Sequence, residues 1–273
     1  MKSRLKPHSV PTRSAPRPDP VRSSSRVTLV LNIGNTSLFG GVQRGKTLRT
    51  FRFAQNDLAG LRLELARTKN ISAAVLCSVV PKLTPKIAAL IRRATGVAPH
   101  VLTADSPHGL KIGYRDPKKL GADRLAAAIG ARALFPQKCV IVVDCGTATT
   151  LTALTKTGEI AGGAILPGAG LWAEALAGRT AQLPKIKLGR PRTSAGRSPE
   201  EAIASGIFFG QLGAVRELVA RLRREVFRGA QVVVVGTGGN APLYAREKLF
   251  TVEEPRLILH GLLVQAGSLS HHA

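Results

Sequence analysis

Short apolar runs alternate with longer segments of helical periodicity along this chain, a pattern typical of an α/β protein. The expected elements of the first half are three strands within 27–53, a helix at 57–67, a buried strand at 71–80, a helix at 85–95, a short edge strand at 100–102, a polar loop at 103–120 and a helix at 121–135. Asp57 is placed to cap the first of these helices, and Gly96 to end the second.

The second half repeats this order. Its expected elements are strands at 139–145, 149–155 and 159–165, a helix at 168–177, a loop at 179–198, a long helix at 199–226, a strand at 231–235 and helices at 240–248 and 256–268. The order βββαβα in each half is the ribonuclease H-like plan. We therefore predict a tail at 1–26 and two domains, at 27–138 and 139–270, each of which contains a mixed five-stranded sheet.

One hairpin lies near the middle of the chain and carries candidate chemistry. The apolar run Val140–Val143 stops at Asp144, and the small-residue turn 145–148 leads into an antiparallel return strand. A carboxylate beside bare backbone N–H groups suits a polyphosphate and its metal ion. On this segment alone, an ordinary sheet with a polar turn explains the pattern as well.

Two further segments favour the functional interpretation. Val27–Gly41 has the same plan, with the polar stretch 32–36 between two apolar strands, so we expect a duplicated domain with a cleft between the copies. Val232–Asn240 is a buried strand that ends in a glycine-rich turn, which would let the backbone approach a nucleotide closely.

Six motifs occur in an order that resembles the type III pantothenate kinases of the actin-like ATPase and sugar-kinase superfamily. They are Asn32-Ile33-Gly34-Asn35-Thr36, then Tyr114 with Pro117 and Leu120-Gly121-Ala122-Asp123-Arg124, then Asp144-Cys145-Gly146-Thr147-Ala148, Gly162-Gly163 with Ile165 and Pro167-Gly168, Gly178-Arg179-Thr180-Ala181 with Leu183-Pro184, and Thr237-Gly238-Gly239. Each motif alone is weak, but six in order, covering roughly 27–266, are specific.

The resemblance implies a fold and an activity. The fold would be α/β, with two ribonuclease H-like domains in the actin-like ATPase architecture. The activity would be ATP-dependent phosphorylation of pantothenate to 4′-phosphopantothenate, the first step of coenzyme A biosynthesis. It further implies Mg²⁺ with the ATP, a monovalent cation (K⁺ or NH₄⁺) and a homodimer. We expect a cytoplasmic location, because the three cysteines have the pattern of reduced core residues.

The resemblance also assigns roles to residues. Asp123 would be the catalytic base that takes the proton of the pantothenate hydroxyl, and Asp144 the ligand of the monovalent cation. The implied ATP-binding residues are Asn32, Ile33, Gly34, Asn35, Thr36, Ser37, Leu38, Phe39 and Thr147. The implied substrate-binding residues are Tyr114, Gly121, Ala122, Asp123, Arg124 and Thr180. Five of these residues also have a purely structural interpretation. Asp123 could stabilise the start of a helix, Asp144 could cap a turn and Arg124 could form an ion pair. Thr180 could be an ordinary loop residue, and Tyr114 could be half-buried for packing.

Asn32 departs from the family pattern, which begins Asp-x-Gly-Asn-Thr. In the superfamily that acid helps to hold the magnesium ion and the phosphates, whereas an amide accepts a hydrogen bond without bringing negative charge. The chain is then either a working kinase that tolerates Asn32 or a degenerate copy that binds ligand without turnover. The working kinase is favoured because the other expected site residues are retained: Asp123, Arg124, Asp144 and Thr180.

Composition adds one unusual property, an excess of 40 basic over 16 acidic residues and a formal charge of +24. A basic chain tends to bind nucleic acid non-specifically. The basic residues are scattered, however, and lack aromatic interleaving, so we expect no nucleic-acid partner. We also expect no membrane association, since no apolar run has transmembrane length, and the three cysteines lack metal-ligand spacing and indicate reduced core residues.

The sequence leaves three hypotheses for the function of the chain. The first is the pantothenate kinase. The second is a non-catalytic, ligand-binding or regulatory homologue of the same fold, for which Asn32 and the positive charge are the only support. The third is a kinase for another small alcohol, against which the intact Leu120–Arg124 and Gly178–Ala181 blocks speak.

Overall fold

The computed structural model describes residues 26–270, so the tail predicted at 1–26 lies, apart from Arg26, outside the described residues. The first half contains β1 (Val27–Ile33), β2 (Ser37–Arg44), β3 (Thr47–Ala54), α1 (Leu58–Arg67), β4 (Ile71–Ser78), α2 (Thr84–Thr95), β5 (His100–Val101), β6 (Lys111–Ile112), a 3₁₀ turn η1 (Pro117–Lys119) and α3 (Ala122–Leu134). Asp57 caps α1 through its carboxylate, and Gly96 ends α2 with a left-handed backbone, as predicted.

The second half contains β7 (Cys139–Cys145), β8 (Ala148–Leu154), β9 (Glu159–Pro167), α4 (Ala169–Arg179), α5 (Pro199–Glu225), β10 (Val232–Thr237), the 3₁₀ helix η2 (Ala241–Glu247), β11 (Val252–Glu253) and α6 (Leu257–Ser270). Within residues 26–270 the strands form two mixed sheets, in the orders β3-β2-β1-β4-β5 and β11-β10-β7-β8-β9-β6. The α/β class with two mixed sheets is thereby confirmed.

Three details differ from the sequence prediction. The second sheet has six strands rather than the expected five. Four of them were located in the sequence; the other two are β6, which lies inside the expected loop at 103–120 and pairs with β9, and β11, which pairs with β10. The helix expected at 240–248 is a 3₁₀ helix, η2. The strands β6 and β11 have two residues each, and no apolar run marks them, so the sequence alone does not reveal them. The equally short β5 was expected at 100–102, where the residues are apolar after His100. The domain boundary predicted at 138/139 stays a prediction.

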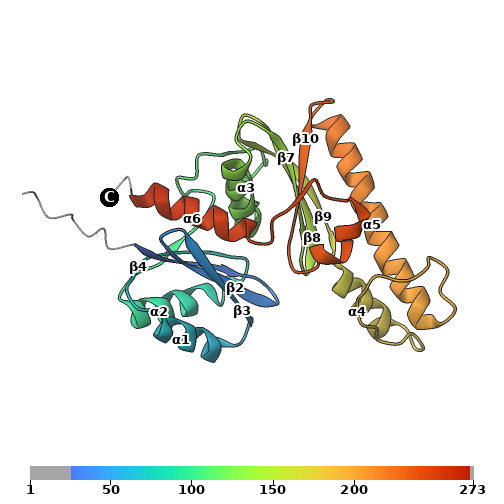
Figure 1. The fold of residues 1–273 in the computed structure, drawn as a ribbon, viewed down its shortest axis with the longest axis horizontal. Coiled ribbons are helices and arrows are strands. Elements are labelled where there is room, and N and C mark those ends of the chain that lie inside the picture. Colours follow the sequence, from blue (N-terminus) through green and yellow to red (C-terminus); the bar gives the residue numbers. More distant parts are fainter. Residues whose placement is uncertain (1–25, 271–273) are drawn as a thin grey trace, which may run out of the picture.

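The elements stack in five layers, which Figure 1 shows from one side. Helices α1 and α2 pack on one face of the first sheet, and α5 packs on the outer face of the second. Between the two sheets lie α3 and α6, and a single core cluster joins these helices to residues from both sheets, among them Val30 and Val142. The last helix of each half therefore lies against both sheets.

Helices α3 and α6 approach each other closely at two glycines. A Cβ on Gly130 would collide with the carbonyl of Leu257, and one on Gly261 with the carbonyl of Ala126. No other residue allows the two backbones to come so close. This close packing keeps the middle layer thin and fixes the N-terminus of α3 relative to both sheets.

Alternation along the strands decides which side chains reach the middle layer. On β1, Leu29 and Leu31 point toward α1 and α2, whereas Val30 points toward α3 and α6. Asn32 follows Val30 by two residues and so shares its face. On β7, Val140 and Val142 face the middle layer in the same way, which places Asp144 there.

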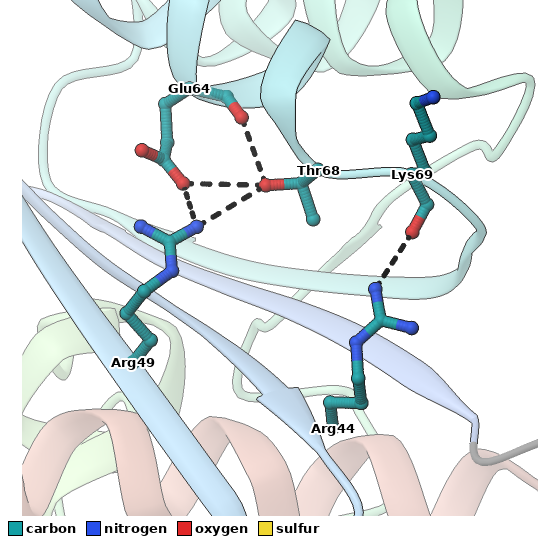
Figure 2. Close-up of polar contacts among 5 residues, drawn as sticks. All are labelled: Arg44, Arg49, Glu64, Thr68 and Lys69. Atoms are coloured by element: carbon teal, nitrogen blue, oxygen red, sulfur yellow. Dashed lines mark hydrogen bonds and ion pairs between the residues drawn. The ribbon is translucent and has the colours of Figure 1, made fainter.

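A polar cluster on the opposite side fastens the first sheet to α1 (Figure 2). Arg49 of β3 forms an ion pair with Glu64 of α1, whose carboxylate also lies 3.3 Å from the hydroxyl of Thr68. Nearby, Arg44 Nη2 donates to the carbonyl of Lys69 at 3.2 Å. The hydrogen bond from Arg49 is the main cause of the lowered pKa of Glu64, so the carboxylate stays charged although its side chain is only 10% exposed.

Helix α5 is the one described helix that is long and apolar enough to cross a membrane by length and composition. Its side chains Phe208, Leu212 and Val215 are buried against the second sheet in a core cluster with Ile141 and Leu151. This packing is that of a core helix in a folded domain.

Candidate active site

A cleft of about 460 Å³ lies where the ends of β1 and β7 meet the N-terminus of α3. Both central sheets contribute to it, together with α4, the turn after β10 and the start of α6. Its lining residues are Asn32, Gly34, Asn35, Thr36, Ser37, Phe39, Arg52, Val79, Asp123, Asp144, Gly146, Thr147, Ala148, Thr150, Gly170, Leu171, Glu174, Leu188, Thr237, Gly238, Gly239, Asn240, Pro255 and Ile258.

The first side of the cleft is the β1–β2 hairpin. Its turn is held by a hydrogen bond from the Gly34 N–H to the Ser37 carbonyl at 3.0 Å. Seven of the nine residues predicted to bind ATP line the cleft; the other two, Ile33 and Leu38, have fully buried side chains in the core against α1 and α2. Only the backbone of those two residues is therefore available to a ligand.

The opposite side is the β7–β8 hairpin, which is braced by the turn after β10. Asn240 Nδ2 donates to the Gly146 carbonyl at 3.3 Å, and the Asn240 N–H to the Cys145 carbonyl at 2.9 Å. Gly238 has a φ of +88°, and a Cβ there would collide with the Asp144 carboxylate. A glycine at this position thus lets the β10 turn close directly over the acid.

Asp123 lies on the first turn of α3, just after Gly121 and Ala122, and lines the cleft. Its Oδ1 accepts the backbone N–H of Arg124 at 2.7 Å. Burial raises the pKa of Asp123, while that hydrogen bond and the Arg124 charge oppose the rise. A carboxylate with a raised pKa in a cleft is typical of a general base.

Asp144, at the end of β7, lines the same cleft. Burial raises the pKa of Asp144 to about 7; the negative charge of Asp123 adds to the rise and the Arg52 guanidinium opposes it. The two carboxylates are therefore close enough to interact, and a bound cation would relieve both the burial and the repulsion.

Arg124 and Tyr114 form a buried network beside the cleft rather than in its lining. The Arg124 guanidinium donates from Nε to Thr152 Oγ1 and from Nη2 to the Leu151 carbonyl, both at 3.0 Å. A third hydrogen bond joins Nη1 to the Tyr114 hydroxyl. The network anchors the start of α3, and with it Asp123, to β8.

Thr180 lies at the C-terminal end of α4, away from the cleft lining. Its hydroxyl donates to the Leu176 carbonyl at 2.7 Å and accepts the Leu183 N–H at 3.3 Å. Thr180 is exposed, so within one copy of the chain it is not gathered with the other predicted substrate-binding residues.

Sequence reasoning gave no role to four polar residues of the cleft: Arg52, Thr150, Glu174 and Asn240. Asn240 ends the glycine-rich turn that the sequence did single out. Arg52 Nη1 donates to Ser37 Oγ at 3.0 Å, and its guanidinium lies 4.1 Å from the centre of the Phe39 ring. The alternation along β3, with Leu48 on the inner face, places Arg52 on that same face two strands from Asn32. That pattern is the signal that could have found it.

The donor set fits a monovalent cation better than a tightly held magnesium ion. Within residues 26–270 no group of three or more His, Cys, Asp or Glu side chains is arranged to hold a metal ion. The cleft offers the half-buried carboxylates Asp123 and Asp144 on one side and the neutral amide of Asn32 on the other. Magnesium would therefore be held largely by phosphate oxygens and water, as is common for nucleotide-bound Mg²⁺.

Comparison with known sequences gives a consistent family. A family model described as type III pantothenate kinase matches residues 28–221. The type III pantothenate kinase of Legionella pneumophila (strain Paris) is 36% identical over 249 residues, which are 87% of this chain and 97% of that relative. Type III pantothenate kinase 1 of Francisella tularensis subsp. holarctica (strain OSU18) is 35% identical over 246 residues, 86% of this chain and 96% of its own.

Solved structures agree at the level of the fold. A Baf family protein from Campylobacter jejuni superposes with a TM-score of 0.56 at 16% identity, over 89% of this chain and 99% of the other. MreB5 of Spiroplasma citri, solved with AMPPNP, gives a TM-score of 0.52 at 10% identity, over 90% and 98% of the two chains. The predicted actin-like architecture is confirmed.

Proposed function

This chain belongs to the type III pantothenate kinase family, and from that premise we propose that its cleft transfers the γ-phosphoryl group of ATP to pantothenate. The reaction yields 4′-phosphopantothenate and is the first step of coenzyme A biosynthesis. The observation that carries the assignment to the cleft is the meeting of two polar hairpins and one half-buried carboxylate, Asp123, around a single space.

In this proposal Asp123 is the catalytic base. It lines the cleft, it is the second residue of α3, and the Arg124 N–H fixes its carboxylate at 2.7 Å. A phosphoryl transfer with a loose transition state needs its alcohol oriented more than fully deprotonated. A fixed carboxylate whose pKa is raised by burial performs both tasks.

The two hairpins would hold the nucleotide. The turn 34–37 and the turn 146–148 face the cleft from opposite sides and carry the hydroxyls of Thr36 and Thr147. Backbone N–H groups and hydroxyls at strand ends are the donors that phosphate oxygens accept from. The glycines after β10 lie beside them and leave room for the rest of the nucleotide.

Two cations complete the proposed site. Asp144 would hold K⁺ or NH₄⁺, and its burial beside Asp123 gives a strong reason for a positive ion there. Mg²⁺ would enter with ATP and stabilise the charge that develops on the transferred phosphoryl group.

Pantothenate would bind next to Asp123, on the side of the Arg124–Tyr114 network. We further propose a homodimer in the cytoplasm with the substrate pocket near the interface. The exposed position of Thr180 at the end of α4 is consistent with a role that needs a second copy of the chain.

Product formation with pantothenate, ATP, Mg²⁺ and K⁺, read by mass spectrometry, tests the proposal. The wild type should release phosphopantothenate, and Asp123→Ala should lower kcat by about 10²–10⁴-fold while still binding ATP. Asp105→Ala is the matched control, because Asp105 is exposed and pairs with Lys118 outside the cleft.

A non-catalytic homologue is the second candidate, and Asn32 is the observation that favours it. It predicts ATP binding without turnover in the same assay. Recovery of activity in Asn32→Asp would then locate the defect at that residue, whereas turnover by the wild type removes this candidate.

A further inference from the structure

Four side chains lie in one row across the first sheet. Asn32 of β1 is in register with Phe39 of β2 and with Cys77 of β4, and Phe39 is in register with Arg52 of β3. Residues in register on neighbouring strands point to the same face. That face is the inner one, and three of the four residues line the cleft: Asn32, Phe39 and Arg52.

Cys77 determines which end of the Asn32 amide faces the cleft. The Cys77 sulfur lies 3.3 Å from Asn32 Oδ1, and the cysteine is fully buried. Burial raises the pKa of Cys77 well above its usual range, so the sulfur keeps its proton and acts as the donor. The amide oxygen is thereby occupied, and Nδ2 is turned to the other side.

The nitrogen of this amide is available to a ligand. Among residues 26–270, Asn32 Nδ2 donates no hydrogen bond, and the amide is held only through Oδ1. Asn32 itself lines the cleft, so the N–H₂ group is presented where the phosphates of a nucleotide would lie. A carboxylate at this position would present only acceptors and would need a cation between itself and a phosphate.

Arg52 adds a fixed positive charge at the other end of the row. Its guanidinium lies over the Phe39 ring at 4.1 Å, and Nη1 donates to Ser37 Oγ at 3.0 Å. In the described part of the chain it has no carboxylate within ion-pair distance. Its remaining N–H groups are free to bind phosphate oxygens, for which a guanidinium is well suited.

We propose that Asn32 and Arg52 of this row bind the phosphates of the nucleotide directly, so that ATP and ADP bind without Mg²⁺. The inference rests on the proposed ATP site and deepens it. Asn32 is a phosphate-binding residue, Arg52 supplies the positive charge, and Cys77 is a positioning residue that orients the amide. Magnesium is then required for the transfer step and not for binding.

Isothermal titration calorimetry of ATP, in EDTA and in excess Mg²⁺, tests this directly. The wild type should bind metal-free ATP within about fivefold of Mg–ATP. Asn32→Asp replaces a donor by a negative charge that faces the phosphates, and should weaken metal-free ATP by about 30-fold or more but Mg–ATP by less than about fivefold. Arg52→Gln should weaken both forms by about tenfold.

The cysteine variants separate orientation from packing. Cys77→Ala leaves the Asn32 amide free to rotate, and should weaken the binding of metal-free ATP by about three- to tenfold. Cys77→Ser keeps a hydrogen-bond donor, so its affinity for metal-free ATP should equal that of the wild type. Cys139→Ala is the matched control, since Cys139 is buried in the other sheet, in the core against α5. Thermal denaturation of each variant verifies that it is folded.

Three results would overturn the inference. The first is a wild type that binds ATP at least about 100-fold more weakly without Mg²⁺ than with it. The others are an Asn32→Asp variant whose ratio of affinities with and without Mg²⁺ is that of the wild type, and an equal loss of ATP affinity in Cys77→Ala and Cys77→Ser. Each leaves the kinase assignment intact if phosphopantothenate is still formed. Absence of nucleotide binding both with and without Mg²⁺ would instead overturn the proposed function.

Discussion

The hydroxyl of Thr36 lies 2.8 Å from the hydroxyl of Thr147, although the two residues are 111 positions apart in the chain. Thr36 belongs to the turn between β1 and β2, and Thr147 to the corresponding turn between β7 and β8. The two hairpins of the duplicated plan therefore touch each other through equivalent residues. A phosphate bound between these turns would accept a hydrogen bond from each hydroxyl, in place of the contact between them.

We expect Thr147→Val to raise the KM for ATP by about 5–20-fold, because one hydrogen bond to a charged group is lost. The KM for pantothenate should change little, since the residue lies on the nucleotide side of the cleft. Steady-state kinetics with each substrate varied in turn measures both values.

The control for this variant is Thr157→Val, which removes an exposed turn hydroxyl that bonds only to Thr155. Its kinetic constants should equal those of the wild type. An unchanged KM for ATP in Thr147→Val would show that the Thr36–Thr147 contact is structural.

Hydrophobic patterning predicted most of the fold because the long elements bury one whole face. The strands β4 and β7 are nearly continuous apolar runs, and each begins and ends within about two residues of its predicted bounds, 71–80 and 139–145. The six-stranded sheet could not be predicted, because β6 comes from the first half and joins β9 through only two residue pairs. Such a pairing depends on where the two halves lie, not on local sequence.

The candidate site was predictable where a motif coincides with a strand end, and less so elsewhere. Asp144 was found in this way at the end of β7, and Asp123 through a motif at the start of α3; both line the cleft. Arg52 was missed because it lies within a strand of mixed exposure, and only the register with Phe39 brings it to Asn32. The burial of Ile33 and Leu38 follows from alternation, which a motif does not encode.

The raised pKa of Asp123 predicts the acid limb of the pH profile. A base acts in its charged form, so kcat/KM should fall as the pH decreases through the raised pKa of this carboxyl. The midpoint of the limb should therefore lie above the usual pKa of an aspartate, which is about 3.9. Initial rates from about pH 3 to pH 8, with substrate concentrations well below KM, measure it.

Asp105→Asn is the control and should leave the dependence of kcat/KM on pH unchanged, because Asp105 is exposed and lies outside the cleft. An acid limb centred at or below the ordinary aspartate pKa of about 3.9 would contradict a burial-raised base.

Asp144→Asn should abolish the response of the rate to K⁺. The substitution keeps the shape of the side chain but removes the charge that attracts the ion. We expect kcat/KM to fall by about 10–100-fold at saturating K⁺, as for the loss of a ligand-shell residue. The rate is measured against KCl concentration, with choline chloride added to hold the ionic strength constant.

Asp116→Asn is the control, since Asp116 caps the 3₁₀ turn η1 and lies outside the cleft. Its K⁺ response should match that of the wild type. A normal K⁺ response in Asp144→Asn would place the monovalent cation elsewhere.

The Arg49–Glu64 pair predicts a pH-dependent contribution to stability. Arg49→Ala leaves the largely buried Glu64 carboxylate without its main partner, and should lower the free energy of unfolding by about 1–3 kcal/mol at pH 7. The folded-state pKa of Glu64 is lowered by Arg49, so this stabilisation is present above the unfolded pKa of about 4.3 and is lost as the pH falls through the folded value. Urea denaturation at pH 7 and pH 3.5 measures the difference.

Arg221→Ala is the matched control, because Arg221 pairs with Glu217 on the surface of α5 and both side chains are 57% exposed. A surface pair of this kind contributes less than about 1 kcal/mol, so this variant should differ little from the wild type at either pH. If Arg49→Ala were as destabilised at pH 3.5 as at pH 7, the loss would come from the packing of the Arg49 side chain against the sheet. The ion pair with Glu64 would then have no part in fastening β3 to α1.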